Sequence, residues 1–174
     1  MVFLSTEKAR TWTLGYGFEL DKLGLPSRSV PGHYSVRCEL PKQLSELVWF
    51  CRFVEAMLET RTQCLLWITT VGVWPSSENW HLYYRLKEVY GDHQLFADAP
   101  AHLFLEFERE DMVTFLQLGV SFGWDMHLLP AKGAVRVFLS HDEFAEFFVE
   151  DLSGRDKIKQ EIIRAGFTVI QPKP

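Results

Sequence analysis

Residues 64–73, CLLWITTVGV, are apolar on both of the alternating faces that a β-strand presents. A strand of this kind must be covered on both sides, as is typical of a central strand in a sheet with packed layers on each face. We therefore expect residues 64–73 to lie in the middle of a sheet that is packed by helices.

Strand and helix patterns alternate along the rest of the chain. Strand patterns occupy 11–20, 33–40, 102–107, 125–129, 134–139 and, as a short edge strand, 167–170 (FTVI). Helix patterns occupy 41–60, 77–90, 109–123, 140–151 and 153–165. The order ββαβαβαββαα(β) predicts one α/β domain, residues 1–174, with a mixed β-sheet packed by helices. Strand–helix–strand alternation through 64–129 predicts right-handed crossovers and a parallel portion of that sheet, with antiparallel hairpins at its edges.

The predicted helix 140–151 has the clearest local signature. It begins with SHDE, in which Ser140 is the cap residue and Glu143 stands three residues on, as in a capping box. In this helix Phe144 and Phe148 would face inward, and Glu146 and Glu150 would face solvent.

The charge of the chain is unevenly distributed. The net charge is -5, but residues 78–151 carry five Lys/Arg against fourteen Asp/Glu, a net charge of -9. An acidic middle argues against nucleic acid as a partner, because phosphates require a basic surface. It suits a basic protein partner.

Three further features bear on where the protein works. The longest uncharged run, 62–77, is too short and too rich in Thr, Gly and Pro to cross a bilayer, so we expect no membrane partner. The N-terminal apolar run meets Glu7 and Lys8 too early for a secretory signal. The three cysteines, Cys38, Cys51 and Cys64, are an odd number with no CxxC spacing. These features favour a reducing, cytoplasmic location.

Two predicted helices carry aromatic pairs outside their main apolar stripe. Trp49 and Phe53 lie one turn apart in 41–60, and Trp80 and Tyr84 lie one turn apart in 77–90. Trp and Tyr are enriched at binding hot spots. Either other parts of this chain cover these rings, or a protein partner or a second copy in a homodimer does.

The sequence lacks the phosphate-binding loops, nucleophile elbows, zinc motifs and calcium loops that identify common enzymes. His102, Glu106, His127 and His141 are an alternative: if their strands are neighbours, these side chains would form a metal site or a general acid–base pocket. No pair among them has a diagnostic ligand spacing, so the sequence predicts no metal and no cofactor.

The acidic residues Asp142, Glu143, Glu146 and Glu150 offer a different function. Clustered carboxylates repel one another, and such a face would steer and hold a basic target. In size and charge alone, the chain is similar to small acidic immunity proteins that inhibit toxin nucleases. The favoured hypothesis is a non-enzymatic interaction module of the inhibitor or immunity type, and the alternative is an enzyme built on the four His and Glu residues above.

Overall fold

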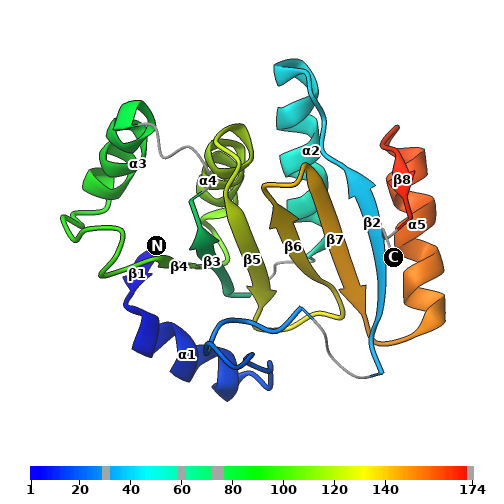
Figure 1. The fold of residues 1–174 in the computed structure, drawn as a ribbon, viewed down its shortest axis with the longest axis horizontal. Coiled ribbons are helices and arrows are strands. Elements are labelled where there is room, and N and C mark those ends of the chain that lie inside the picture. The colour runs from blue at the N-terminus through cyan, green and yellow to red at the C-terminus, as the bar shows by residue number, and fades with distance from the viewer. Residues whose placement is uncertain (29–31, 59–61, 72–76, 172–174) are drawn as a thin grey trace.

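The computed structural model describes residues 1–28, 32–58, 62–71 and 77–171, which form five helices and eight strands (Figure 1). In chain order these are β1 (Val2–Leu4), α1 (Thr6–Gly15), β2 (Tyr34–Glu39), α2 (Leu44–Met57), β3 (Cys64–Thr70), α3 (Ser77–Val89), β4 (Ala101–Phe104), α4 (Arg109–Ser121), β5 (Asp125–Pro130), β6 (Arg136–Ser140), β7 (Phe144–Val149), α5 (Leu152–Arg164) and β8 (Val169–Ile170). The predicted α/β class is confirmed. The ends of two predicted elements, residues 59–60 and 72–73, lie outside the described residues. In the part of the chain that is described, no helix has the length and apolar character needed to cross a membrane.

All eight strands belong to one sheet in the order β1-β4-β3-β5-β6-β7-β2-β8. Every neighbouring pair is antiparallel. As predicted from its two apolar faces, β3 lies inside the sheet, paired with β4 on one edge and β5 on the other.

The predicted parallel portion of the sheet is wrong. The strand pairings make β2 parallel to β3 and β4 parallel to β5, but other strands separate each of these pairs. The crossover helices α2 and α4 therefore join parallel strands that are not neighbours. Helix α3 joins neighbours instead, because the segment after it returns the chain to the C-terminal end of β3, where the Ile68 N–H donates to the Pro100 carbonyl over 3.2 Å.

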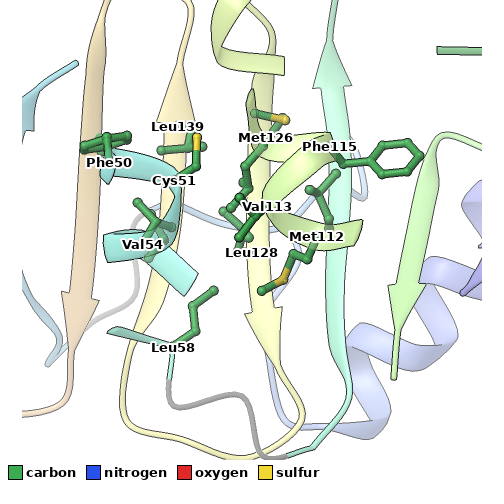
Figure 2. Packing of buried hydrophobic residues seen from close by; sticks show 14 of the residues in the cluster. Phe50, Cys51, Val54, Leu58, Met112, Val113, Phe115, Met126, Leu128 and Leu139 are labelled. Carbon is green, nitrogen blue, oxygen red and sulfur yellow. The ribbon is translucent and has the colours of Figure 1, made fainter. Parts of the chain in front are cut away.

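The main core lies on the sheet face that α2 and α4 cover (Figure 2). Phe50 and Val54 from α2, Val113 from α4, Leu128 of β5 and Leu139 of β6 belong to this core cluster, and all are buried. We call this side the core face. Apolar side chains at these helix positions recur every three or four residues, which is the spacing that gathers them on one side of each helix.

Alternate residues of the same strands point to the opposite face, where α1 covers part of the sheet. There Leu65 and Trp67 of β3 pack with Ala101, Leu129 and Ala9 of α1 in a second cluster. Residues adjacent in a strand point to opposite faces, so β3 contributes Leu66 and Ile68 to one core and Leu65 and Trp67 to the other.

The strand predicted at 11–20 is wrong, since Thr6–Gly15 form helix α1. The Ser5 side chain caps this helix by accepting a hydrogen bond from the Lys8 N–H. The apolar residues at 12 and 16 satisfy both a two-residue and a four-residue period. The rings of Trp12 and Tyr16 contact each other one turn apart, tilted by 36° and with centroids separated by 4.3 Å. The three-residue strand β1, which precedes α1, was not predicted.

The helix predicted at 140–151 is also wrong, because residues 144–149 form β7. His141–Glu143 form a three-residue hairpin turn between β6 and β7, and Glu143 adopts a positive φ of 64°. The Ser140 hydroxyl accepts from the Asp142 N–H over 3.2 Å, so it caps a turn rather than a helix. Phe144 and Phe148 are four residues apart, a spacing that places them on one side of a strand as well as of a helix.

We predict that the close approach of α4 to β5 depends on Gly119. A Cβ at this position would overlap the Sδ and Cε atoms of the buried Met126. Gly119→Ala should therefore lower the free energy of unfolding by about 1–2 kcal/mol, although Ala is the better helix former. Urea denaturation followed by circular dichroism measures the change.

Gly15→Ala is the matched control, because a Cβ there meets no atom within 4 Å. It should leave stability unchanged or raise it by up to about 1 kcal/mol. In a Met126→Ala background the loss from Gly119→Ala should disappear. A loss of equal size in both backgrounds would show that Gly119 acts in some other way.

Candidate functional site

Helix α1 leaves part of the opposite sheet face without a helical cover. On this part, Phe138 of β6 and Phe144 and Phe148 of β7 form a small buried cluster, with Ile170 of β8 packed against it. The register of β6, β7 and β2 places these rings on the side away from the main core, since each alternates with a core residue.

Guanidinium groups lie on these rings. The Arg28 guanidinium carbon is 4.1 Å from the centre of the Phe138 ring, and that of Arg37 is 4.5 Å from the Phe144 ring. Arg136 lies 4.5 Å from the centre of the Phe148 ring and donates to the Ser27 carbonyl over 2.9 Å. Cations stacked on aromatic faces are attracted by the ring quadrupole, and the flat guanidinium suits this packing.

The buried carboxylate of Glu146 holds two of these arginines. Its Oε2 atom lies 3.0 Å from an Arg37 nitrogen and 3.6 Å from an Arg28 nitrogen. Its Oε1 atom accepts a hydrogen bond of 2.9 Å from the Ser35 hydroxyl. A carboxylate that is only 5% exposed requires such partners, because an unpaired buried charge is strongly destabilising.

A pocket of about 630 Å³ opens beside this cluster at the end of the β6–β7 hairpin. We call it the hairpin pocket; its lining residues are Arg28, Arg37, Glu39, Asp142, Glu143, Phe144, Ile170 and Gln171. Three carboxylates and two guanidiniums belong to this lining. Both guanidiniums are within reach of Glu146, Glu39 lies 3.7 Å from Lys42, and Asp142 lies 3.6 Å from His141 Nε2. Asp142 and Glu143 are the exposed carboxylates of the pocket.

Asp125 fixes the turn 141–143, which carries the exposed carboxylates of Asp142 and Glu143. One of its oxygens accepts the backbone N–H of His141 over 2.8 Å and lies 2.9 Å from His141 Nδ1. With the turn held in this way, Asp142 and Glu143 project into solvent at the rim of the pocket.

The predicted acidic residues lie in a hairpin turn and in or just after a strand, not on the helix on which they were expected. Asp142 and Glu143 are exposed and line the hairpin pocket, as a binding role requires. Glu146, predicted to face solvent, is buried because β7 turns it onto the same side as Phe144 and Phe148. Glu150 is exposed but follows the other end of β7, away from the hairpin turn.

The four rings of the two predicted aromatic pairs differ in their burial. Trp80 and Tyr84 are partly buried by this chain, since Trp80 packs on Trp124 and Phe96 at centroid distances of 5.9 and 5.4 Å. Phe53 packs on Phe147 and Phe167. Trp49 differs from the other three rings, because it is 71% exposed on the outer side of α2.

The alternative His/Glu site does not assemble around one point. His102 lies on the core face, with Nε2 3.0 Å from the Tyr83 hydroxyl, and His127 lies on the opposite face against Phe138. Glu106 is exposed beyond the end of β4, and His141 is in the hairpin turn. Among the residues that the structure describes, no three His, Cys, Asp or Glu side chains are arranged to hold a metal ion.

Burial lowers the pKa of both His102 and His127 to about 3, with nearby cations, Lys87 for His102 and Arg28 and Arg136 for His127, acting in the same direction. Both rings are therefore neutral near pH 7.

Arg28, Arg37 and Glu39 line the pocket but were not predicted from the sequence as binding residues. Arg37 and Glu39 alternate with the buried Val36 and Cys38 in the strand predicted at 33–40, so their common side could be expected. Nothing in the sequence pairs that side with residue 146.

Comparisons of the chain with protein-family models, with curated proteins and with solved structures find no match.

We predict opposite outcomes for two tryptophans. Trp80→Ala should lower the free energy of unfolding by roughly 3 kcal/mol, because it removes a ring that packs on other aromatic side chains. Trp49→Ala should change it by no more than about 0.5 kcal/mol, since this ring is exposed. Chemical denaturation of both variants tests the assignment, and equal losses would contradict it.

The two buried histidines predict a loss of stability in mild acid. Each takes up a proton near its ordinary pKa of 6.5 when the chain unfolds, but only near 3 when it is folded. The unfolded state therefore binds more protons between these values, and stability falls as pH falls through this window. From pH 7 to pH 5, each histidine should remove about 2 kcal/mol of unfolding free energy.

His127→Gln and His102→Gln should each abolish its own share of this pH dependence, measured by urea denaturation at both pH values. His81→Gln, at an exposed position on α3, is the control and should retain the wild-type dependence. A wild-type stability that is equal at pH 5 and pH 7 would contradict the neutral, buried state of both rings.

Proposed function

We propose that this protein is a non-enzymatic interaction module of the inhibitor or immunity type, and that its hairpin pocket receives a basic segment of a partner protein. The observation that carries this proposal is the exposed pair Asp142 and Glu143 at the rim of a pocket that the partly buried Ile170 also lines. Exposed carboxylates beside an apolar wall suit the two parts of a lysine or arginine side chain.

The contacts can be assigned by chemistry. The aliphatic stem of a lysine or arginine would lie against Ile170, because Arg37 already covers the Phe144 ring, and its charged end would reach Asp142 and Glu143. Arg28 and Arg37 have donors only, so they suit the backbone carbonyls of the same segment. Because Glu146 shares both guanidiniums, their repulsion of an incoming cation is reduced.

The charge distribution supports the same partner. Residues 78–151 carry the surplus of acidic groups, and Glu106, Asp142, Glu143 and Glu150 of this segment are exposed. Some of the other acidic residues are paired within the chain, including Glu110 with Arg52 and Glu108 with the N-terminal amino group. The exposed set would speed the approach of a basic protein and would act less strongly at high salt.

An enzymatic function has less support. His102 and His127 are buried on opposite faces of the sheet, so they cannot act together on one substrate. The buried cysteines also lack nucleophilic character, since burial raises the pKa of the Cys38 and Cys51 thiols to about 12. Buried free thiols suit a reducing compartment, and we place the module in the cytoplasm on this basis.

The test is a titration of the isotopically labelled protein with a short peptide that contains one arginine flanked by glycines. Weak binding, in the millimolar range, should shift the amide resonances of Glu143, Phe144 and Gln171. Asp142→Asn combined with Glu143→Gln should remove these shifts, because it removes the carboxylates at the rim. High salt should weaken them.

Asp98→Asn is the matched control, because Asp98 is an exposed carboxylate outside the pocket lining. This variant should bind the peptide as the wild type does. A peptide with glutamate in place of arginine should cause no shift. Equal shifts with both peptides, or shifts confined to other parts of the molecule, would refute the basic-partner assignment.

A further inference from the structure

His141 stands between two carboxylates at the rim of the hairpin pocket. Its Nδ1 atom lies 2.9 Å from Asp125 Oδ1, and its Nε2 atom lies 3.6 Å from Asp142 Oδ1. The register of β5 against β6, in which Met126 pairs with Leu139, brings the start of β5 to the turn that carries His141. The imidazole ring therefore lies between a carboxylate that holds the turn and a carboxylate at the binding rim.

The contact with Asp125 determines which nitrogen of the neutral ring carries the hydrogen. An ionised carboxylate only accepts hydrogen bonds, so Nδ1 is the donor to Asp125 and Nε2 is left as an acceptor. The Asp142 oxygen that faces Nε2 is an acceptor too, so these two atoms share no hydrogen. The Asp142 side chain, which is 72% exposed, can then turn toward solvent or toward a bound cation.

A proton on Nε2 reverses this relation. Histidine is the side chain that ordinarily changes its charge between pH 5 and pH 8. The imidazolium has a donor on each nitrogen, and each donor faces a carboxylate, Asp125 on β5 and Asp142 on the turn itself. From the segment between α4 and β5, the residue that approaches the His141 Cβ is Gly123, which carries no charge. The protonated ring would thus join both carboxylates.

We propose that protonation of His141 weakens the binding of a basic segment in the hairpin pocket, so that the partner is released in mild acid. When the ring is neutral, Asp142 and Glu143 are both available to a lysine or arginine. When it is charged, the imidazolium holds Asp142 and adds a positive charge at the rim, which repels an incoming cation. This regulation acts on the same site and therefore rests on the proposed function.

The proton and the basic segment compete for one carboxylate. An exposed ion pair is weak, and Glu143 stays available in both states, so the dissociation constant should change by about threefold to tenfold rather than by orders of magnitude. The competition is reciprocal, because two ligands that oppose each other do so by the same factor in both directions. A bound basic segment should therefore displace the proton from His141.

The test uses the arginine peptide described above, with its ends acetylated and amidated. Arginine keeps its charge at every pH used, so the protein alone titrates. The dissociation constant, measured from amide shifts of the labelled protein, should be about threefold to tenfold higher at pH 6 than at pH 8. Circular dichroism at both pH values checks that the fold is kept, because the buried His102 and His127 oppose folding in acid.

The imidazole ring of His141 gives a second and more direct measurement. At pH 6, adding the peptide should move the ring carbon resonances of His141 toward the positions that they have at pH 8. This readout reports the competition itself, and a ring that only supports the turn would not show it. The ring resonances of His93, which is exposed outside the pocket lining, should not respond to the peptide.

Three variants assign the effect. His141→Gln should bind the peptide with the same dissociation constant at pH 6 and pH 8, because no group between Asp125 and Asp142 then changes its charge. Asp142→Asn should bind more weakly at pH 8 and lose most of the pH dependence, because Glu143 alone remains. His93→Gln is the matched control and should retain the full pH dependence.

The outcomes separate this inference from the proposed function. A peptide that binds at neither pH overturns both. A peptide that binds equally well at pH 6 and pH 8 overturns the regulation and leaves the basic-partner function standing. A pH dependence that survives in His141→Gln also overturns the regulation, because another group must then cause it. Loss of the pH dependence in His141→Gln, with its retention in His93→Gln, supports the inference.

Discussion

The burial of β3 on both of its faces is the constraint on which the rest of the structure depends. Its side chains from Cys64 to Ile68 are at most 2% exposed, and they point alternately to the two sides of the sheet. Both sides therefore need a cover at this point. Helices α2 and α4 provide it on the core face, and α1 provides it on the opposite face, where Ala9 allows the helix to approach Leu65 and Trp67. The position of α1 over one end of the sheet follows from the position of β3.

The far part of the opposite face must be sealed without a helix, and this gives the candidate site its chemistry. Phenylalanine rings on β6 and β7 are covered by arginine side chains, which combine a flat apolar surface with a charge. These charges would repel one another if unpaired, and Glu146 from the middle of β7 lies beside two of them. The same arrangement explains why the hairpin pocket has guanidiniums in its wall, whereas its exposed carboxylates, Asp142 and Glu143, lie on the turn. The arginines that cover these phenylalanine rings are thus also the cations that line the hairpin pocket.

The sequence predicted the elements better than their connections. Strand β3, helices α2 to α5 and the edge strand β8 follow from periodicity, because each has one dominant apolar pattern. Residues 144–149 do not follow from periodicity, because Phe144 and Phe148 fit the period of a strand as well as that of a helix, and Ser140 before them caps a turn. The alternation of strands and helices predicted a parallel portion of the sheet, but β3 is antiparallel to β4, and the parallel strands β4 and β5 are separated by β3. The candidate site was predicted only at Asp142 and Glu143. Its arginines are more than a hundred residues from Glu146, and only the register of β2 against β7 pairs Arg37 with it.

Helix α3 is oriented by polar contacts as well as by the burial of Tyr83 in the main core. Its Lys87 is fully buried, 3.0 Å from Asp92 and stacked on the Phe3 ring, whereas Val89 two residues later is 78% exposed. Burial acts against the charge of Asp92, yet hydrogen bonds from Lys87 and Gln94 hold the pKa of its carboxyl below the ordinary value. Tyr83, one turn earlier, reaches His102 of β4. A helix free to rotate would bury its valine and expose its lysine. Because this network opposes that rotation, Val89 stays on the exposed side of α3 and Lys87 stays buried.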